Sequence, residues 1–97
     1  MLRHIVMIRI KENLDKVDVS KELKNKLEAL EDSIESLLRI EVGINISTKP
    51  SAFDVVLTAD FATEEDLDKY RIHTDHVVVL DYLREVMEKV VVVDYFI

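Results

Sequence analysis

The chain contains no cysteine, a single glycine and a single proline among its 97 residues. Without cysteine there is no disulfide, thiolate metal site, iron–sulfur cluster or cysteine nucleophile. One glycine cannot supply a glycine-rich phosphate-binding loop. The proline, Pro50, lies in the one obvious loop, Ser47 to Ser51, and we find no repeat, linker or low-complexity segment.

Basic residues and long apolar runs are also scarce. The 13 Lys and Arg residues against 20 Asp and Glu residues give a net charge of -7, which repels nucleic-acid phosphates. The longest apolar runs, such as Val77 to Leu80 and Val90 to Val93, are far shorter than the roughly 20 residues of a membrane helix. No secretory signal is recognisable at the start. We therefore expect a soluble, cytoplasmic protein without nucleic-acid or membrane partners.

The length predicts one domain over residues 1–97 with one hydrophobic core, and association is a plausible source of further stability. Alternating apolar residues predict strands over 2–11, 38–46 and 53–61, and the β-branched and aromatic residues of 90–97 predict a fourth. In the first strand the more apolar face should meet the helices and bury His4. That face consists of Leu2, His4, Val6, Ile8 and Ile10.

Two helical regions separate these strands. The first begins near Asp18 or Ser20, either of which could cap it, and its apolar stripe is Leu23, Leu27, Leu30, Ile34 and Leu37. The second begins at Thr63, which is spaced as a capping residue before Asp66. A break is expected at residues 73–76 with Thr74 as a new cap. The run 77–79 alone would equally suggest a strand.

This order of elements predicts an α+β, ferredoxin-like βαββαβ fold with a four-stranded antiparallel sheet and helices on one face. The opposite face would expose an apolar stripe of Ile5, Met7 and Val56, together with whichever of Val92 and Phe96 project that way. Two copies packed sheet to sheet would cover it and form a dimeric α/β barrel. Arg9, Glu41, Asn45 and Thr58 would make that interface partly polar, with Glu41 and Asp94 inside the barrel. Scattered surface hydrophobes remain the alternative.

Several segments resemble the stress-responsive A/B barrel (Dabb) family. They are residues 3–7 (RHIVM), 40–45 (IEVGIN) and 93–95 (VDY), together with 70–76 (YRIHTDH), which is similar to the family's tyrosine followed by H-P-x-H. Two departures are visible. Glu35-Ser36 stands where members often have Pro-Gly, and Thr74 replaces the proline between the histidines, which could alter how the loop presents His76.

The resemblance implies a homodimeric barrel with a cavity between each sheet and its helices. Most bacterial relatives have no known reaction. A plant member closes a polyketide chain without a cofactor, using a tyrosine and a histidine that match Tyr70 and His76, and His4 matches a histidine of that pocket. Tyr70 and His76 are therefore the catalytic candidates, with His4 and His73 in support.

The chemistry suits that assignment, since a neutral histidine can take a proton from carbon beside a carbonyl while a phenol donates to the developing oxyanion. Neither a cofactor nor a metal is expected. The alternative is structural: His4 as a core histidine, His73 fixing a turn, and Tyr70 as packing. His73, His76 and Asp75 could also bind a metal, although spacing secures no further ligand.

Two classes of function follow. A cofactor-free enzyme of the polyketide cyclase type would have a cavity lined by Val6, Ile8, Leu57 and the Tyr70/His76 pair. A non-catalytic dimeric binding or stress-associated module would fill that space with side chains. A small hydrophobic or phenolic molecule is the expected ligand.

Overall fold

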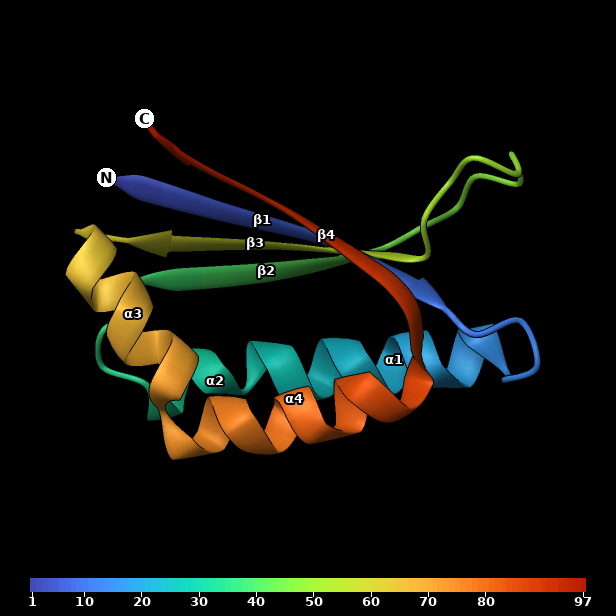
Figure 1. Cartoon of the computed structure of the whole chain (residues 1–97), viewed down its shortest axis with the longest axis horizontal. Coiled ribbons are helices and arrows are strands. Elements are labelled where there is room, and N and C mark those ends of the chain that lie inside the picture. Colours follow the sequence, from blue (N-terminus) through green and yellow to red (C-terminus); the bar gives the residue numbers. More distant parts are fainter.

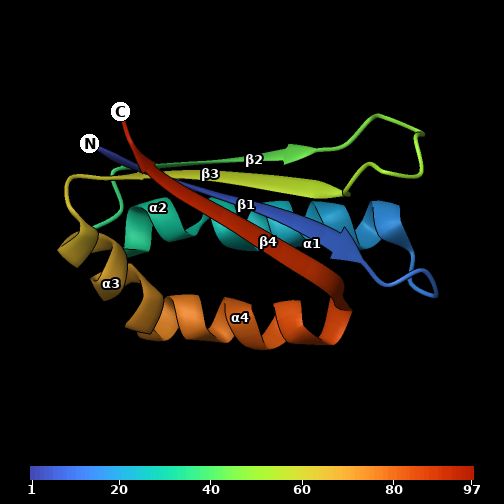
Figure 2. The same cartoon turned by 45° about the horizontal axis from the view of Figure 1, so that its top comes forward.

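A sheet and a layer of helices on one of its faces make up the molecule, and the computed structural model describes residues 1–97 (Figures 1 and 2). All strand pairs are antiparallel and the strand order is β2-β3-β1-β4. The predicted ferredoxin-like α+β fold is confirmed. In chain order the elements are β1 (Leu2–Ile10), α1 (Lys16–Glu28), α2 (Leu30–Ser33), β2 (Arg39–Ile44), β3 (Val55–Phe61), α3 (Glu64–Ile72), α4 (Thr74–Val86) and β4 (Met87–Phe96).

Strand β1 is central and carries the buried face that its alternation predicts. Partners in an antiparallel pair project to the same face, so the register sets the buried side of the whole sheet. His4 pairs with Ala59 of β3 and with Asp94 of β4. Every even residue of β1 is buried, His4 included: Leu2, His4, Val6, Ile8 and Ile10.

The first helical region differs from the prediction at both of its ends. Its cap is Asp15, whose side chain accepts from the backbone N–H groups of residues 17 and 18, so Asp18 and Ser20 lie within the helix. The predicted stripe is buried throughout, but helix α1 ends at Glu28 and α2 is one short turn. At Ile34 the backbone is already extended, with φ −114° and ψ 108°, and this directs the chain toward β2.

The second helical region follows its sequence signals more closely. Thr63 caps α3 by accepting from the Asp66 backbone N–H, as predicted. The chain breaks at His73, but the cap of α4 is His73 itself and not Thr74: Nδ1 of His73 accepts from the Asp75 backbone N–H at 3.1 Å. Thr74 is the first helical residue, and residues 77–79 belong to α4. None of the helices is long and apolar enough to cross a membrane.

The sheet face away from the helices, here called the outer face, carries the predicted apolar stripe with one correction. Ile5 pairs with Val93 and Met7 with Val91, so the β4 side chains on this face are Val91, Val93 and Tyr95. Val92 and Phe96 have the opposite parity and project toward the helix side. Met7 and Val93 are 41% and 61% exposed in the single chain, which leaves this face open to an apolar contact.

Candidate functional site

A cavity of about 350 Å³ lies between the sheet and helices α1 and α4. This volume is within the range of small-molecule sites, at roughly 300–1,000 Å³. Eleven of its fourteen lining residues are hydrophobic. The lining comprises His4, Val6 and Ile8 of β1, Leu23 and Leu27 of α1, Leu57 of β3, Tyr70 and Arg71 of α3, His76, Val79, Leu80 and Leu83 of α4, and Val90 and Val92 of β4.

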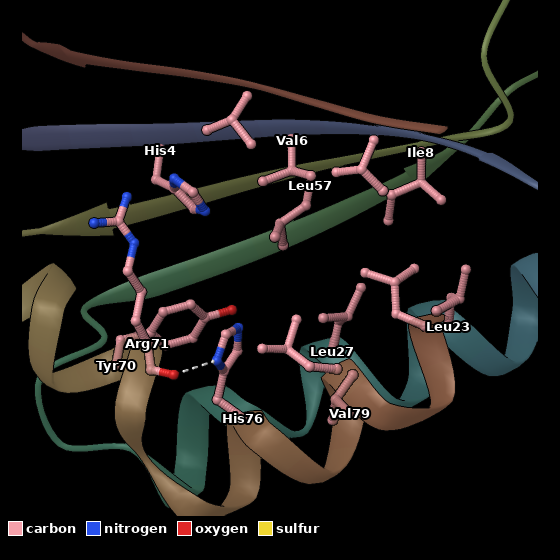
Figure 3. A pocket seen from close by; sticks show the side chains of 14 residues that line it. His4, Val6, Ile8, Leu23, Leu27, Leu57, Tyr70, Arg71, His76 and Val79 are labelled. Carbon is pink, nitrogen blue, oxygen red and sulfur yellow. Dashed lines mark hydrogen bonds between the residues drawn. The ribbon is translucent and has the colours of Figure 1, made fainter. Parts of the chain in front are cut away.

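The structure brings together most of the candidate residues. Val6, Ile8 and Leu57 form part of the apolar wall, and Figure 3 shows Tyr70, Arg71, His76 and His4 gathered at one end of the cavity. His73 is not among them. The helix breaks at this residue, so Tyr70, His73 and His76 do not share one helical face. The His73 ring caps α4 instead.

Tyr70 is the most enclosed of the polar residues, with only 1% of its surface exposed. Its ring centroid lies 4.2 Å from that of His76 and 5.1 Å from that of Phe61. Its buried hydroxyl has no hydrogen-bond partner in the chain. Burial raises the pKa of this phenol well above its ordinary value, so the hydroxyl remains protonated and can donate.

His76 presents one of its two ring nitrogens to the cavity. The other, Nδ1, lies 3.1 Å from the carbonyl oxygen of Arg71. A carbonyl only accepts, so Nδ1 carries the proton and Nε2 of the neutral ring is a bare acceptor. Burial lowers the pKa of His76 below its ordinary value, which keeps the ring neutral at neutral pH.

His4 belongs to a polar network that sequence reasoning missed. Its Nδ1 meets Oδ1 of Asp94, and Oδ2 of the same carboxylate accepts from the Arg71 guanidinium at 3.2 Å. A second Arg71 nitrogen donates to Asp68 at 3.2 Å. Asp94 therefore faces the helix side and not the outer face, which corrects its expected place inside the barrel. Glu41 does lie on the outer face, opposite Thr58.

The metal-binding alternative finds no geometric support. His73 and His76 direct their Nδ1 atoms to different backbone groups, the Asp75 N–H and the Arg71 carbonyl. The structure contains no group of three His, Asp or Glu residues that could hold a metal ion. What the site does assemble is one phenol donor and two imidazoles within an apolar cavity.

Comparison with protein-family models gives one match, described as the stress responsive A/B barrel domain, over residues 2–97. Comparison with curated proteins gives no match. Among solved structures, a dimeric protein of unknown function with a ferredoxin-like fold from Bacteroides fragilis has a TM-score of 0.90 at 28% identity, with 99% of this chain and 95% of that chain covered.

Two further solved structures share the fold. A Dabb family protein from Mesorhizobium loti has a TM-score of 0.79 at 24% identity, covering 99% of this chain and 95% of that one. A hydroxynitrile lyase from Passiflora edulis has a TM-score of 0.85 at 18% identity, covering 99% and 92%. At these identities the likeness concerns the fold alone.

Proposed function

The chain belongs to the stress responsive A/B barrel domain family, and from this premise we propose that residues 1–97 act as one homodimeric domain that binds a small hydrophobic or phenolic molecule between sheet and helices. The observation that carries the proposal is the unpartnered Tyr70 hydroxyl, buried beside His76 in an otherwise apolar cavity. A buried hydroxyl without a partner costs roughly 1–3 kcal/mol. A ligand oxygen or nitrogen in the cavity would recover that cost.

The size and lining of the cavity favour the same class of ligand. A volume of about 350 Å³ walled mainly by aliphatic side chains suits an alkyl chain or an aromatic ring. The polar groups gather at one end, so the ligand should carry its polar atoms at one end as well (Figure 3).

The homodimer is supported by the outer face and by relatives. Dimeric structures are described for the Bacteroides fragilis protein and for similar ferredoxin-like proteins from Thermobifida fusca and Jannaschia. In this chain Met7, Val93 and their neighbours leave an apolar surface that a second copy would remove from water. The cavity lies on the opposite side of the sheet, so each protomer holds its own.

A cofactor-free polyketide cyclase-like reaction is the second candidate, favoured by the contact between Tyr70 and His76. Nε2 of neutral His76 would take a proton from carbon beside a carbonyl, leaving an enolate whose oxygen receives a hydrogen bond from the Tyr70 hydroxyl. The enolate carbon then attacks a second carbonyl of the same substrate molecule, which forms the new carbon–carbon bond. The proton on His76 returns to the alkoxide so formed.

Ligand binding is tested by calorimetric titration with 4-alkylphenols and by native mass spectrometry of the purified protein. We expect binding that Leu80→Trp abolishes, because Leu80 lines the cavity and the larger ring would occupy it. Val78→Trp is the matched control on the same helix, since Val78 is 63% exposed and does not line the cavity. Failure of every hydrophobic and phenolic probe, with no copurified molecule, would overturn the proposal.

The enzymatic candidate has its own test. His76→Ala and Tyr70→Phe should each lower turnover of a linear polyketide-like substrate by roughly a hundredfold or more. Turnover is followed by absorbance of the cyclised product, and circular dichroism checks that both variants fold. Unchanged turnover in both would exclude these roles.

A further inference from the structure

The edge of the cavity holds a chain of three polar side chains contributed by three elements. His4 lies on β1, Asp94 on β4 and Arg71 at the end of α3. Each oxygen of the Asp94 carboxylate is engaged, Oδ1 by His4 Nδ1 and Oδ2 by Arg71. The carboxylate is therefore fixed from two sides, and it fixes the imidazole in turn.

This contact decides which nitrogen of a neutral His4 ring carries the proton. An ionised carboxylate can only accept, so a neutral His4 ring must hold its proton on Nδ1 and leave Nε2 bare. Nε2 makes no hydrogen bond within the chain, and the side chain lines the cavity. His76 is in the same state, because the Arg71 carbonyl engages its Nδ1.

With both rings neutral, the polar end of the cavity offers two imidazole acceptors and one phenol donor. Arg71 adds little positive charge for a ligand, since its guanidinium already serves Asp94 and Asp68. A ligand hydroxyl can donate to a bare imidazole nitrogen and accept from Tyr70 at once. A carboxylate can accept from Tyr70 but has no hydrogen to give to the imidazole nitrogens, so its charge would lie in an apolar cavity with one donor and against two imidazole lone pairs.

We propose that Asp94 is a positioning residue that holds His4 with Nε2 unprotonated toward the cavity, and that the site thereby selects ligands with a phenol or enol hydroxyl over carboxylates. This inference rests on the proposed ligand-binding function. It goes further by naming the ligand's polar group and a role for Asp94 and Arg71.

The tautomer is measured on the ligand-free protein by nitrogen-15 NMR of the imidazole rings, of which the chain has three. We expect the His4 proton on Nδ1. In Asp94→Asn the amide oxygen should face Arg71, because Arg71 only donates. The amide NH₂ then faces His4 and donates to Nδ1, so the His4 proton moves to Nε2. Asp94→Ala, which removes both groups, should leave a mixture. Asp68→Asn is the matched control, because it relieves Arg71 of its other carboxylate and should leave His4 unchanged.

Selectivity is measured by calorimetric titration with 4-butylphenol, 4-butylbenzoate and butylbenzene. Wild type should prefer the phenol to the benzoate by roughly tenfold or more, the value of about one buried hydrogen bond. Asp94→Asn should weaken phenol binding several-fold and leave butylbenzene binding unchanged, whereas Asp68→Asn should alter neither.

Two outcomes would overturn the inference and leave the proposed function standing: a benzoate that binds as tightly as the phenol, or a His4 tautomer that is the same in wild type, Asp94→Asn and Asp94→Ala. If none of the three probes binds, the proposed function fails and the ligand preference fails with it. The role of Asp94 toward His4 is then decided by the ring spectra alone.

Discussion

At the scale of single residues, we expect the Tyr70 hydroxyl to lower the stability of the fold and to favour ligand binding. It is buried without a partner, so Tyr70→Phe removes an unsatisfied polar atom and keeps the ring contacts with Phe61 and His76. We expect the free energy of unfolding in urea to rise by about 1 kcal/mol, while phenol binding weakens. Tyr82→Phe is the control: its hydroxyl donates to Glu22 at 3.1 Å, so stability should fall slightly. A clear loss of stability in Tyr70→Phe would contradict the assignment.

His76 makes stability depend on pH. Burial is the main reason why its pKa lies below the ordinary 6.5, and the hydrogen bond with the Arg71 carbonyl opposes that shift only in part. The unfolded chain therefore binds the proton more readily than the folded chain does. This contribution to stability is present above about pH 6.5, the unfolded value, and is lost progressively as pH falls toward the folded pKa.

Thermal unfolding of wild type and His76→Asn between pH 8 and pH 5 tests this dependence. The asparagine amide can still donate to the Arg71 carbonyl but does not titrate. We expect the midpoint of wild type to fall below about pH 6.5 and the variant to show a flatter profile. Equal slopes of the unfolding midpoint against pH in the two proteins would mean that other titrating groups dominate between pH 8 and pH 5.

Some of these residues could be predicted from the sequence and others could not. The parity of β1 was enough to place His4 on the helix side, since four aliphatic residues share its face. Asp94 gave no comparable signal, because its role depends on the register of β4 against β1, and these strands are about 90 residues apart. It is the one acidic residue of the otherwise apolar run from residue 90 to residue 97. A single acidic residue within an apolar strand is the sequence signal that could have pointed to a partly buried polar contact.

At the scale of elements, the junction between α3 and α4 positions the candidate site. Tyr70 and Arg71 end one helix and His76 begins the next, with His73 as the residue between the helices. The extended ψ of 136° at His73 lets its own ring reach the Asp75 N–H, whereas Thr74 is already helical. Cap preferences alone favour the threonine, and backbone geometry selects the histidine.

A pair of alanine substitutions distinguishes these caps. His73→Ala should lower the free energy of unfolding by about 1 kcal/mol, because it leaves an N–H at the start of α4 without its acceptor. Thr74→Ala should change it by less than about 0.5 kcal/mol. Urea denaturation followed by circular dichroism compares them. The reverse order of effects would restore Thr74 as the cap.

Periodicity predicted which residues are buried better than where the elements end. The stripe from Leu23 to Leu37 is buried as predicted, yet it spans two helices and a turn. The spacing of apolar residues reports contact with the sheet, and a chain that bends along the sheet can keep that spacing while its helix breaks. The predicted strand boundaries likewise differ by up to three residues from those of β2, β3 and β4, and only the end of β3 matches.

At the scale of the whole molecule, the two faces of the sheet differ in character. The helix side encloses the cavity, and the outer face carries an apolar stripe crossed by charged residues. Arg3 pairs with the buried Asp60 on that face at 2.9 Å, and Arg3 also holds the pKa of Asp60 below its usual value. The stripe beside this pair is Ile5, Met7, Val56, Val91 and Val93. A contact between copies through this face would leave both cavities unobstructed.

Dimerisation through the outer face is the prediction that belongs to this scale. Light scattering after size exclusion should give wild type a mass of twice the 11.3 kDa chain at micromolar concentration. Met7→Glu and Val93→Glu each bury a charge twice in a symmetric contact, so each should weaken the dimer by roughly a hundredfold or more. Val78→Glu places the same charge on α4, at an exposure of 63% that matches the 61% of Val93, and should leave the mass unchanged. A wild type with the mass of one chain, or two outer-face variants that keep the wild-type mass, would mean that this face is not the contact.

Ligand binding supplies an independent check: phenol binding should survive in the monomeric variants, because the cavity is lined by residues of one chain on the other side of the sheet.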